Sequence, residues 1–220
     1  KTHLLQAICP AAIRARGSQP PLRIYYVSCD GFRSQFEEAV RRGIMHDFRH
    51  CFRNVDMLVV DDIHDLSQNE LSQEEFFHTF NSLYQSGKQI VLSSDAAPVE
   101  IPALEERLVS RFSCGLVAKV DKPCYETRVA IAKRKAALRQ YDVPDDVASY
   151  VAARIDTNIR ELEGAIVKIQ GFALTYNRPI DLDLAKEAIG VREPRIGAGL
   201  SIQSILARIT AYYGCRLSEL

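Results

Sequence analysis

Apolar and polar residues follow two different periods along the first 120 residues. Three short apolar runs, RIYYVS at 23–28, DMLVVDD at 56–62 and KQIVLSSD at 88–95, predict β-strands. The middle run is continuously apolar, which is typical of a strand buried on both faces of a parallel sheet. A further run, GLVAKV at 115–120, predicts another strand.

Helical periods separate these runs. FRSQFEEAVRR follows the first, with Asp30 as its expected N-cap, and LEERLVSRF follows the third. SQEEFFHTFNSLYQ follows the second, and its Ser72 and Glu75 have the spacing of a capping box. Strands that alternate with helices predict an α/β fold with a parallel sheet. The apolar residues of the helix predicted at SQEEFFHTFNSLYQ recur at helical spacing and should face that sheet: Phe76, Phe77, Phe80, Leu83 and Tyr84.

The pattern becomes entirely helical after residue 122. Three helices are predicted over 125–141, 145–155 and 158–176, and a short fourth over 181–189. VREPRIGAG then interrupts the pattern, and an amphipathic helix is expected over 201–213. We therefore divide the chain into 1–121, 122–190 and a truncated segment, 191–220. The last predicted helix has one apolar face, formed by Ile202, Ile205, Leu206 and Ile209.

Composition narrows the class of protein. The chain has 220 residues, 47% of them hydrophobic, with 28 basic and 28 acidic side chains. A formal charge of zero argues against a chain whose main task is gripping duplex DNA, so any large nucleic-acid footprint is local or lies outside it. No apolar run approaches the roughly 20 residues that cross a bilayer, and no secretory signal is visible. Six cysteines form no CxxC pair and favour free thiols in a reducing cytosol over zinc: Cys9, Cys29, Cys51, Cys114, Cys124 and Cys215.

The motif LVVDDIH carries the first candidate site. Asp61 and Asp62 follow a buried strand, and carboxylates at such a place are costly to leave unpaired. The end of a sheet strand is also where α/β folds bind ligands. Four apolar residues followed by two acids form the Walker B pattern and predict a magnesium site. On this motif alone, a strand that ends in solvated aspartates is an open alternative.

The first residues of the chain, KTHLLQAI, carry the second candidate site. A P-loop reads G-x-x-x-x-G-K-[ST]; its lysine reaches the phosphates and its hydroxyl binds Mg²⁺. Lys1 and Thr2, followed by an apolar helical pattern, match the end of that motif. The glycine-rich part would then precede the given sequence. The alternative is chance, because Lys-Thr dipeptides are common.

Three further groups of polar residues are candidates. Ser93, Ser94 and Asp95 end the third apolar run, either as a polar turn or as groups that contact a γ-phosphate or the attacking water.

Arg107 and Arg111 lie four residues apart on one helical face. Arg160 lies in the first turn of a helix, where a cation opposes the helix dipole and therefore hints at an anionic partner. The alternative for all three arginines is pairing with nearby acids, namely Glu105, Glu106, Glu161 and Glu163.

Taken together, the motifs resemble the AAA+ ATPases, and more narrowly the bacterial chromosomal replication initiators. The resemblance covers residues 1 to about 190 and rests on KTHLLQAI, VDMLVVDDIH, SQEEFFHTFNSLYQSGKQIVLSSD, LEERLVSRF, ETRVAI and NIRELEGAI, in that order. SQEEFFHTFN and NIRELEGA are the most specific of these. SIQSILARITAYYGCRLSEL resembles the start of the family's C-terminal DNA-binding domain.

The resemblance implies an architecture. It makes 1–121 a P-loop AAA+ core, 122–190 a helical lid, and 191–220 a linker with the start of a DNA-binding domain. It implies ATP or ADP and Mg²⁺ as cofactors. Lys1 and Thr2 would be the Walker A lysine and the Mg²⁺-binding hydroxyl.

The resemblance also implies roles for the acids and the arginines. Asp61 would organise the Mg²⁺ shell, Asp62 would polarise the attacking water and Asp95 would act as sensor I. Arg111 would be an arginine finger offered to a neighbouring subunit, with Arg107 in the same motif. The lid residue Arg160 would be sensor II. Positioning and charge stabilisation of this kind are what phosphoryl transfer requires.

The implied function is an ATP-dependent replication initiator in the bacterial cytoplasm, associated with the nucleoid. It would bind double-stranded origin DNA, assemble into ATP-bridged oligomers and promote duplex opening, with weak hydrolysis of ATP to ADP as the off-switch. Further implied partners are single-stranded DNA, acidic phospholipids and replication regulators.

One stretch departs from the family. Glu37, Glu38 and Leu71 stand where the initiators carry aliphatic and basic residues that hold single-stranded DNA. Acidic side chains repel a phosphate backbone, which puts single-strand binding in doubt, with Arg41 and Arg42 as substitutes.

Two other functions are alternatives. An initiator-like regulatory adaptor would bind nucleotide and a replication partner without opening DNA; the segment after Gly199 argues against it, because such adaptors end with the lid. A metabolic P-loop kinase would need neither the lid nor NIRELEGA.

Overall fold

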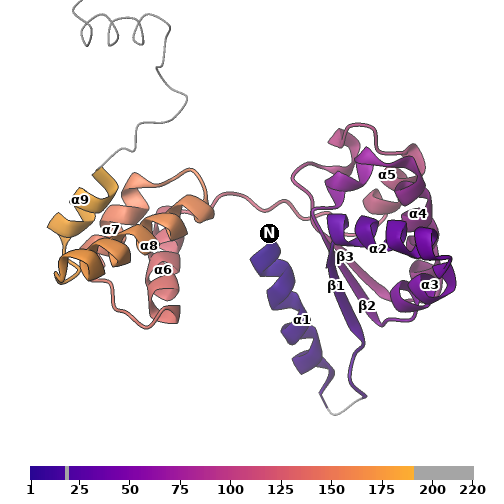
Figure 1. The fold of residues 1–220 in the computed structure, drawn as a ribbon, viewed down its shortest axis with the longest axis horizontal. Coiled ribbons are helices and arrows are strands. Elements are labelled where there is room, and N and C mark those ends of the chain that lie inside the picture. Colours follow the sequence, from indigo (N-terminus) through magenta and orange to yellow (C-terminus); the bar gives the residue numbers. More distant parts are fainter. Residues whose placement is uncertain (18–19, 191–220) are drawn as a thin grey trace, which may run out of the picture. The chain divides into compact units, whose positions relative to one another are not determined.

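A computed structural model describes residues 1–17 and 20–190 of the chain (Figure 1). The helix expected over 201–213 lies outside the described residues. The chain divides between Val120 and Asp121 into two compact units, and each is described by itself. Among the described helices, none is both long and apolar enough to cross a bilayer.

The first unit is built on a parallel sheet of three strands in the order β1-β2-β3. These are β1 (Ile24–Ser28), β2 (Met57–Asp61) and β3 (Gln89–Leu92). The central strand β2 is buried along its whole length, as its apolar sequence predicts. The predicted α/β fold with a parallel sheet is confirmed.

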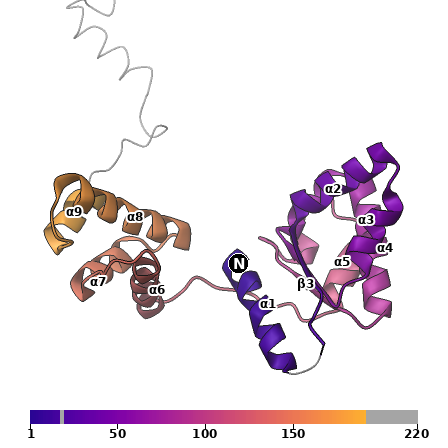
Figure 2. The same ribbon diagram turned by 60° about the horizontal axis from the view of Figure 1, so that its bottom comes forward.

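Helices cover both faces of this sheet (Figures 1 and 2). On one face lies α1 (Thr2–Arg16), and on the other lie the remaining helices of the unit. Side chains of β2 alternate between them: Val59 packs with Leu5 of α1, whereas Leu58 and Val60 belong to the larger core on the opposite face. The helices of the larger core are α2 (Cys29–Arg42), α3 (Met45–Arg53), α4 (Glu70–Gln85) and α5 (Glu106–Ser113).

Two short 3₁₀ helices complete the unit. The first, η1 (Ile63–Gln68), joins β2 to α4, and the second, η2 (Pro98–Glu100), lies between β3 and α5. The larger core is rich in phenylalanine, and the ring of Phe32 meets those of Phe48, Phe52 and Phe76 edge to face. The buried thiol of Cys29 lies beside this core, 4.0 Å from the carbonyl oxygen of Ile63, and burial raises its pKa to about 12.

The caps predicted for two helices are wrong. Ser28, not Asp30, caps α2, because its hydroxyl accepts a hydrogen bond from the Gly31 N–H at 3.1 Å. Asn69, not Ser72, caps α4, because its side chain accepts from the Ser72 N–H at 2.9 Å. In both cases the capping residue has the extended backbone that an N-cap requires.

The five apolar residues predicted to face the sheet from α4 divide into two groups. Phe76, Phe80 and Leu83 are buried in the core. Phe77 is partly buried and Tyr84 is 54% exposed, so the prediction is wrong for Tyr84. The rings of Phe77 and Tyr84 instead lie beside arginines of α5.

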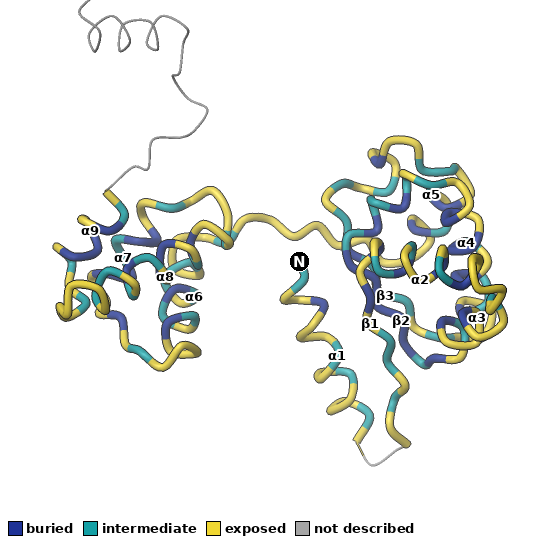
Figure 3. Tube along the Cα trace, in the orientation of Figure 1, coloured by how far each residue is buried: buried dark blue, intermediate teal, exposed yellow. Residues whose placement is uncertain are grey.

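The strand predicted over 115–120 is also wrong. This segment has no regular structure and is exposed along its length (Figure 3). Leu116 is 97% exposed. A strand needs a neighbour to satisfy its backbone, and within residues 1–17 and 20–190 none lies beside this segment. Its apolar sequence therefore does not form a strand here.

The second unit is all-helical within its described residues. Its helices are α6 (Tyr125–Leu138), α7 (Asp145–Arg154), α8 (Ile159–Tyr176) and α9 (Leu182–Gly190), which confirms the four that were predicted. They enclose a separate core in which Val147, Leu162, Ile166 and Leu184 are fully buried. The unit thus has the apolar interior of an independent domain.

Candidate functional site

Polar side chains converge where strands β2 and β3 end and helix α1 begins. Lys1 is the N-cap residue of α1 and Thr2 its first residue, Asp61 is the last residue of β2, and Asp95 follows β3. Parallel strands share a carboxyl edge, and α/β folds bind ligands outside that edge. The structure therefore brings together four residues that the sequence placed in three separate motifs.

The carboxylate of Asp61 is buried and has hydrogen-bond donors on both oxygens. The Ser93 hydroxyl donates to Oδ1, and the Tyr26 hydroxyl donates to Oδ2 at 2.9 Å. The nearby Thr2 hydroxyl also acts to lower the pKa of this carboxyl group. Burial acts to raise the pKa of Asp61, but the hydrogen bonds outweigh it and hold the pKa below its ordinary value. Asp61 is therefore ionised at neutral pH.

Ser93 also fixes the turn that follows Asp61. Its hydroxyl accepts from the Asp62 N–H at 3.0 Å, and its carbonyl oxygen accepts from the Ile63 N–H at 2.8 Å. Asp62 has left-handed backbone angles, φ 55° and ψ 47°, which a residue other than glycine adopts at some cost. The bonds from Ser93 hold this turn, so that Asp62 directly follows the strand end in a defined conformation.

Lys1 and Asp95 meet at the same edge. The Lys1 ammonium lies 2.7 Å from Asp95 Oδ1, with both side chains partly exposed. An exposed ion pair adds little stability, so the pair matters for where it holds the two charges. The ring of His64 lies beside them: its Nε2 is 3.7 Å from Asp95 Oδ2, and its Nδ1 accepts from the Asp95 N–H at 3.5 Å.

Tyr26 and His64 were not among the residues predicted from the sequence. Tyr26 lies opposite Val59 in the sheet register, and Ser28 lies opposite Asp61. Alternate residues of neighbouring strands share a face, so Tyr26 reaches Asp61 diagonally. The contact between Tyr26 and Asp61 could be predicted only from the register of the two strands. Burial and the hydrogen bond to Asp61 raise the pKa of Tyr26 to about 12, so the phenol stays a donor.

The donor set at this edge fits Mg²⁺, which prefers oxygen ligands. The ionised carboxylate of Asp61 and the hydroxyl of Thr2 are such ligands. In the described part of the chain, no group of three or more His, Cys, Asp or Glu side chains is suited to hold a metal ion. A cation held by Thr2 and Asp61 would therefore complete its shell with water or with oxygens of a bound ligand.

The arginines of α5 lie against α4 rather than against the site at the strand ends. The Arg107 guanidinium pairs with Glu105 and lies 4.7 Å from the ring centroid of Phe77. The Arg111 guanidinium lies 6.0 Å from the ring centroid of Tyr84. The expected acidic alternative thus holds for Arg107, whereas Arg111 forms no ion pair among the described residues.

Arg160 is the second residue of α8, in the second unit. The helix is capped by Asn158, whose side chain accepts from the Glu161 N–H at 2.8 Å. Glu161 bonds to Thr157 and Asn158, and Glu163 lies 3.1 Å from Lys135. The two acids proposed as alternative partners of Arg160 are thus engaged elsewhere.

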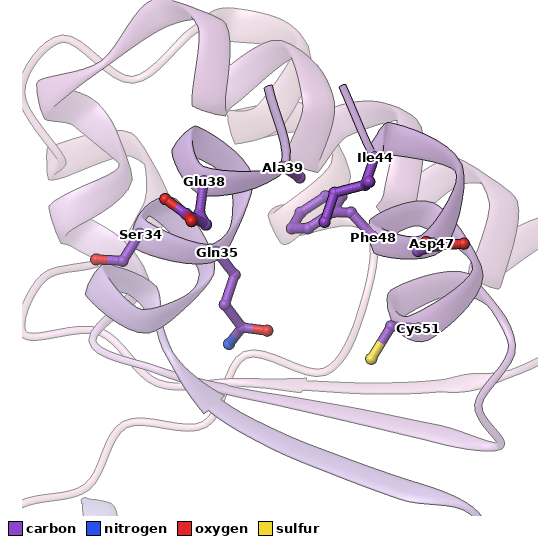
Figure 4. A pocket seen from close by; sticks show the side chains of 8 residues that line it. All are labelled: Ser34, Gln35, Glu38, Ala39, Ile44, Asp47, Phe48 and Cys51. Carbon is purple, nitrogen blue, oxygen red and sulfur yellow. The ribbon is translucent and has the colours of Figure 1, made fainter. Parts of the chain in front are cut away.

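The stretch that departs from the family lies on α2 and at the start of α4. Glu37 is exposed, and Leu71 is 66% exposed. Glu38 pairs with both Arg41, at 3.0 Å, and Arg42. The arginines expected as substitutes are therefore already paired with an acid. A hollow opens between α2 and α3 at this place (Figure 4), lined by Ser34, Gln35, Glu38, Ala39, Ile44, Asp47, Phe48 and Cys51.

Comparisons with known proteins agree with these observations. The family model described as bacterial DnaA ATPase domain matches residues 1–119. The chromosomal replication initiator protein DnaA of Levilactobacillus brevis is 43% identical over 221 residues, and that of Thermoanaerobacter sp. is 42% identical over 219. The matches cover 100% of this chain but 48% and 49% of those proteins. The chain thus spans about half the length of its relatives.

Solved structures give the same result. Domain III of the Thermotoga maritima replication initiation protein DnaA has a TM-score of 0.80 and 37% identity, over 86% of this chain and 78% of that one. A replication initiator DnaA bound to AMPPCP and single-stranded DNA has a TM-score of 0.65 and 32% identity, over 86% and 66%. A Thermotoga maritima RuvB, at 18% identity and a TM-score of 0.56 over 94% and 74%, shares the fold.

Proposed function

The chain belongs to the family of bacterial DnaA ATPase domains, and on that basis we propose that it is the ATP-responsive part of a replication initiator. The observation that carries the proposal is the convergence of Lys1, Thr2, Asp61 and Asp95 at one edge of the sheet. The whole protein would bind double-stranded origin DNA, assemble through bound ATP and promote duplex opening. Slow hydrolysis to ADP would end the active state.

Nucleotide would bind with its phosphates beside Lys1. Thr2 and Asp61 would hold Mg²⁺, which supplies positive charge to the phosphate oxygens when it is bound. The Lys1 ammonium lies 2.7 Å from Asp95 Oδ1, so an arriving phosphate competes with Asp95 for the lysine. Asp95 would then act as sensor I, and Asp62, whose backbone N–H donates to the Ser93 hydroxyl at 3.0 Å, would orient the attacking water.

The remaining parts of the chain would regulate this site. We assign 1–121 as the AAA+ core, 122–190 as the lid and 191–220 as a linker with the start of a DNA-binding domain. Arg160 would be sensor II in the lid. Arg111, with Arg107 beside it, would contact the ATP of a neighbouring subunit, because a guanidinium can bind phosphate oxygens bidentately.

Binding of Lys1 to nucleotide can be tested in the full-length protein with a fluorescent ATP analogue. Lys1→Ala should weaken the affinity by about 10- to 100-fold, the size expected for a lost charged hydrogen bond. His3→Ala is the matched control, because His3 is exposed two residues further on, in the first turn of α1. Equal affinities for Lys1→Ala and wild type would contradict the proposal.

A second candidate function is the regulatory adaptor, and one observation favours it. Glu37 and Glu38 occupy the expected single-strand-binding stretch, and Glu38 pairs with Arg41 and Arg42. A surface without unpaired basic side chains would bind a single strand weakly. An adaptor needs no such surface.

The two functions differ in what they do to origin DNA. Permanganate probing of a supercoiled origin plasmid would show unpaired thymines after the full-length initiator is added with ATP but not with ADP. An adaptor would leave the duplex closed under both conditions, whatever its nucleotide affinity.

A further inference from the structure

We propose that one face of α4, formed by Gln73, Phe77 and Tyr84, positions the arginines of α5 for a neighbouring subunit. These three residues lie at i, i+4 and i+11, within one stripe of the helix. Gln73 contacts the loop before α5, Phe77 contacts Arg107, and Tyr84 contacts Arg111. The inference rests on the proposed role of Arg111 in trans and adds the residues that set its position.

Gln73 fixes the loop that leads into α5. Its side chain is buried; Nε2 donates to the Ala103 carbonyl oxygen at 3.1 Å, and Oε1 accepts from the Glu105 N–H at 2.9 Å. Ala103 has a left-handed φ of 56°, which an alanine adopts at a cost. An amide that bonds to backbone at both ends defines where the loop runs, and hence where α5 begins at Glu106.

Tyr84 holds Arg111 without neutralising it. The ring lies 6.0 Å from the Arg111 guanidinium and is itself stacked on Phe80, with 6.0 Å between the ring centroids. An aromatic face attracts a guanidinium while leaving its N–H groups available for an anion. A carboxylate in the same place would occupy those donors.

Arg107 gives the contrast within the same helix. It too lies over an aromatic ring, that of Phe77 at 4.7 Å, but Glu105 binds its guanidinium as well. Arg111 forms no such pair among the described residues. The two arginines of one helical face therefore differ in availability, and Arg111 is the one presented to an external phosphate.

The test uses the full-length protein and two measurements, ATP affinity of the isolated protomer and ATP-dependent assembly on DNA by light scattering. Tyr84→Leu should raise the assembly midpoint about two- to five-fold, the fold-change that corresponds to about 0.5–1 kcal/mol for an exposed cation–π contact. Protomer ATP affinity should stay at the wild-type value. Tyr84→Phe keeps the ring and should assemble like wild type.

The matched control is Tyr176→Leu. Tyr176 is 56% exposed, close to the 54% of Tyr84, but it lies on α8. This variant should assemble like wild type. Gln73→Met should raise the assembly midpoint in the same direction as Tyr84→Leu, and its melting temperature shows whether the variant is folded.

A double-mutant cycle separates positioning from a general structural effect. If Tyr84 acts through Arg111, Tyr84→Leu should add nothing in an Arg111→Ala background. Suppose that Arg111→Ala alone impairs assembly. The inference is then overturned if Tyr84→Leu has the same effect in the wild-type and the Arg111→Ala backgrounds, or no effect in either. Normal assembly of Arg111→Ala would overturn the trans role of Arg111 and this inference together.

Discussion

The Tyr26 hydroxyl donates to Oδ2 of Asp61 at 2.9 Å, from the neighbouring strand of the sheet. Ser93 donates to the other carboxylate oxygen from the opposite side. The orientation of the carboxylate is thus set by protein groups before any ligand is present. A preset orientation lowers the cost of binding a cation that requires strict ligand geometry.

Tyr26→Phe should weaken Mg²⁺-dependent nucleotide binding by about five-fold and leave binding in excess chelator unchanged. The variant removes one of the donors that lower the pKa of Asp61, worth about 1 kcal/mol. Magnesium titrations followed with a fluorescent nucleotide measure this. Tyr25→Phe is the control, because Tyr25 also donates one hydrogen bond, to Gln35 at 2.9 Å, but not to Asp61. Equal magnesium dependence in the two variants would contradict the assignment.

Glu75→Gln should destabilise the fold at pH 7 by about 3 kcal/mol, measured by guanidinium denaturation. Glu75 is buried and pairs with Arg49 at 2.8 Å and Arg53 at 2.6 Å, so the change removes the charged acceptor of several hydrogen bonds at a buried site. Glu74→Gln is the control: its side chain is 56% exposed, and the change should stay within about 0.5 kcal/mol.

The difference in unfolding free energy between wild type and Glu75→Gln should shrink in acid. Burial acts to raise the pKa of Glu75, but hydrogen bonds from Arg49 and the charge of Arg53 lower it below the ordinary 4.5. A lowered folded-state pKa contributes stability that is full above the unfolded value and is lost as the pH falls through the folded value. The gap between wild type and Glu75→Gln should therefore narrow below pH 4.5. A gap that widens in acid would show that the ion pairs are not its source.

Asn69→Ala and Ser72→Ala should differ, although both residues stand near the start of α4. Asn69→Ala removes the observed cap and should cost about 1 kcal/mol of unfolding free energy. The Ser72 hydroxyl is buried without a hydrogen-bond partner in the structure, so its removal should cost less than about 0.5 kcal/mol or stabilise the fold. Chemical denaturation of the two variants decides the matter, and the reverse order would restore the capping box at Ser72.

Arg160→Ala should leave the melting temperature unchanged, since neither the cap of α8 nor the nearby ion pairs use this side chain. If Arg160 is sensor II, the ratio of ATP to ADP affinity should change. Arg178→Ala, which removes an ion pair with Glu187 at 2.9 Å, is the control and should not alter that ratio. An unchanged ratio in Arg160→Ala would make the residue an ordinary surface cation.

Sequence periodicity predicted the three strands, the helices over 32–42, 72–85 and 104–112, the four helices of the second unit, and the helix that follows Lys1. It failed where two neighbours offer the same chemistry. Asp30 and Ser72 can cap a helix as well as Ser28 and Asn69 can, and only the backbone conformation decides between them. It also failed at 115–120, because an apolar run becomes a strand only beside a partner.

The candidate site was predictable to the extent that parallel strands share an edge. That rule brings Asp61 and Asp95 together, and with them the start of α1. The rule does not predict the positions of Tyr26 and His64. The position of Tyr26 depends on the strand register, and that of His64 depends on the turn at Asp62. The contact of Tyr84 with Arg111 was likewise hidden, since helical spacing placed that ring toward the sheet.

Because Cys29 is buried, the rate at which a thiol reagent labels it reports local opening of the structure around the strand ends. With a pKa of about 12, only about one thiol in 100,000 is a thiolate at pH 7, and its Sγ lies 4.0 Å from the carbonyl oxygen of Ile63, two residues after Asp61. A thiol reagent reaches it only when the start of α2 separates from that turn. Cys51, Cys114 and Cys124 are exposed and Cys9 is partly exposed, so that, among the described cysteines, the slowest labelling phase is the one that reports openings next to the carboxylate edge of the sheet.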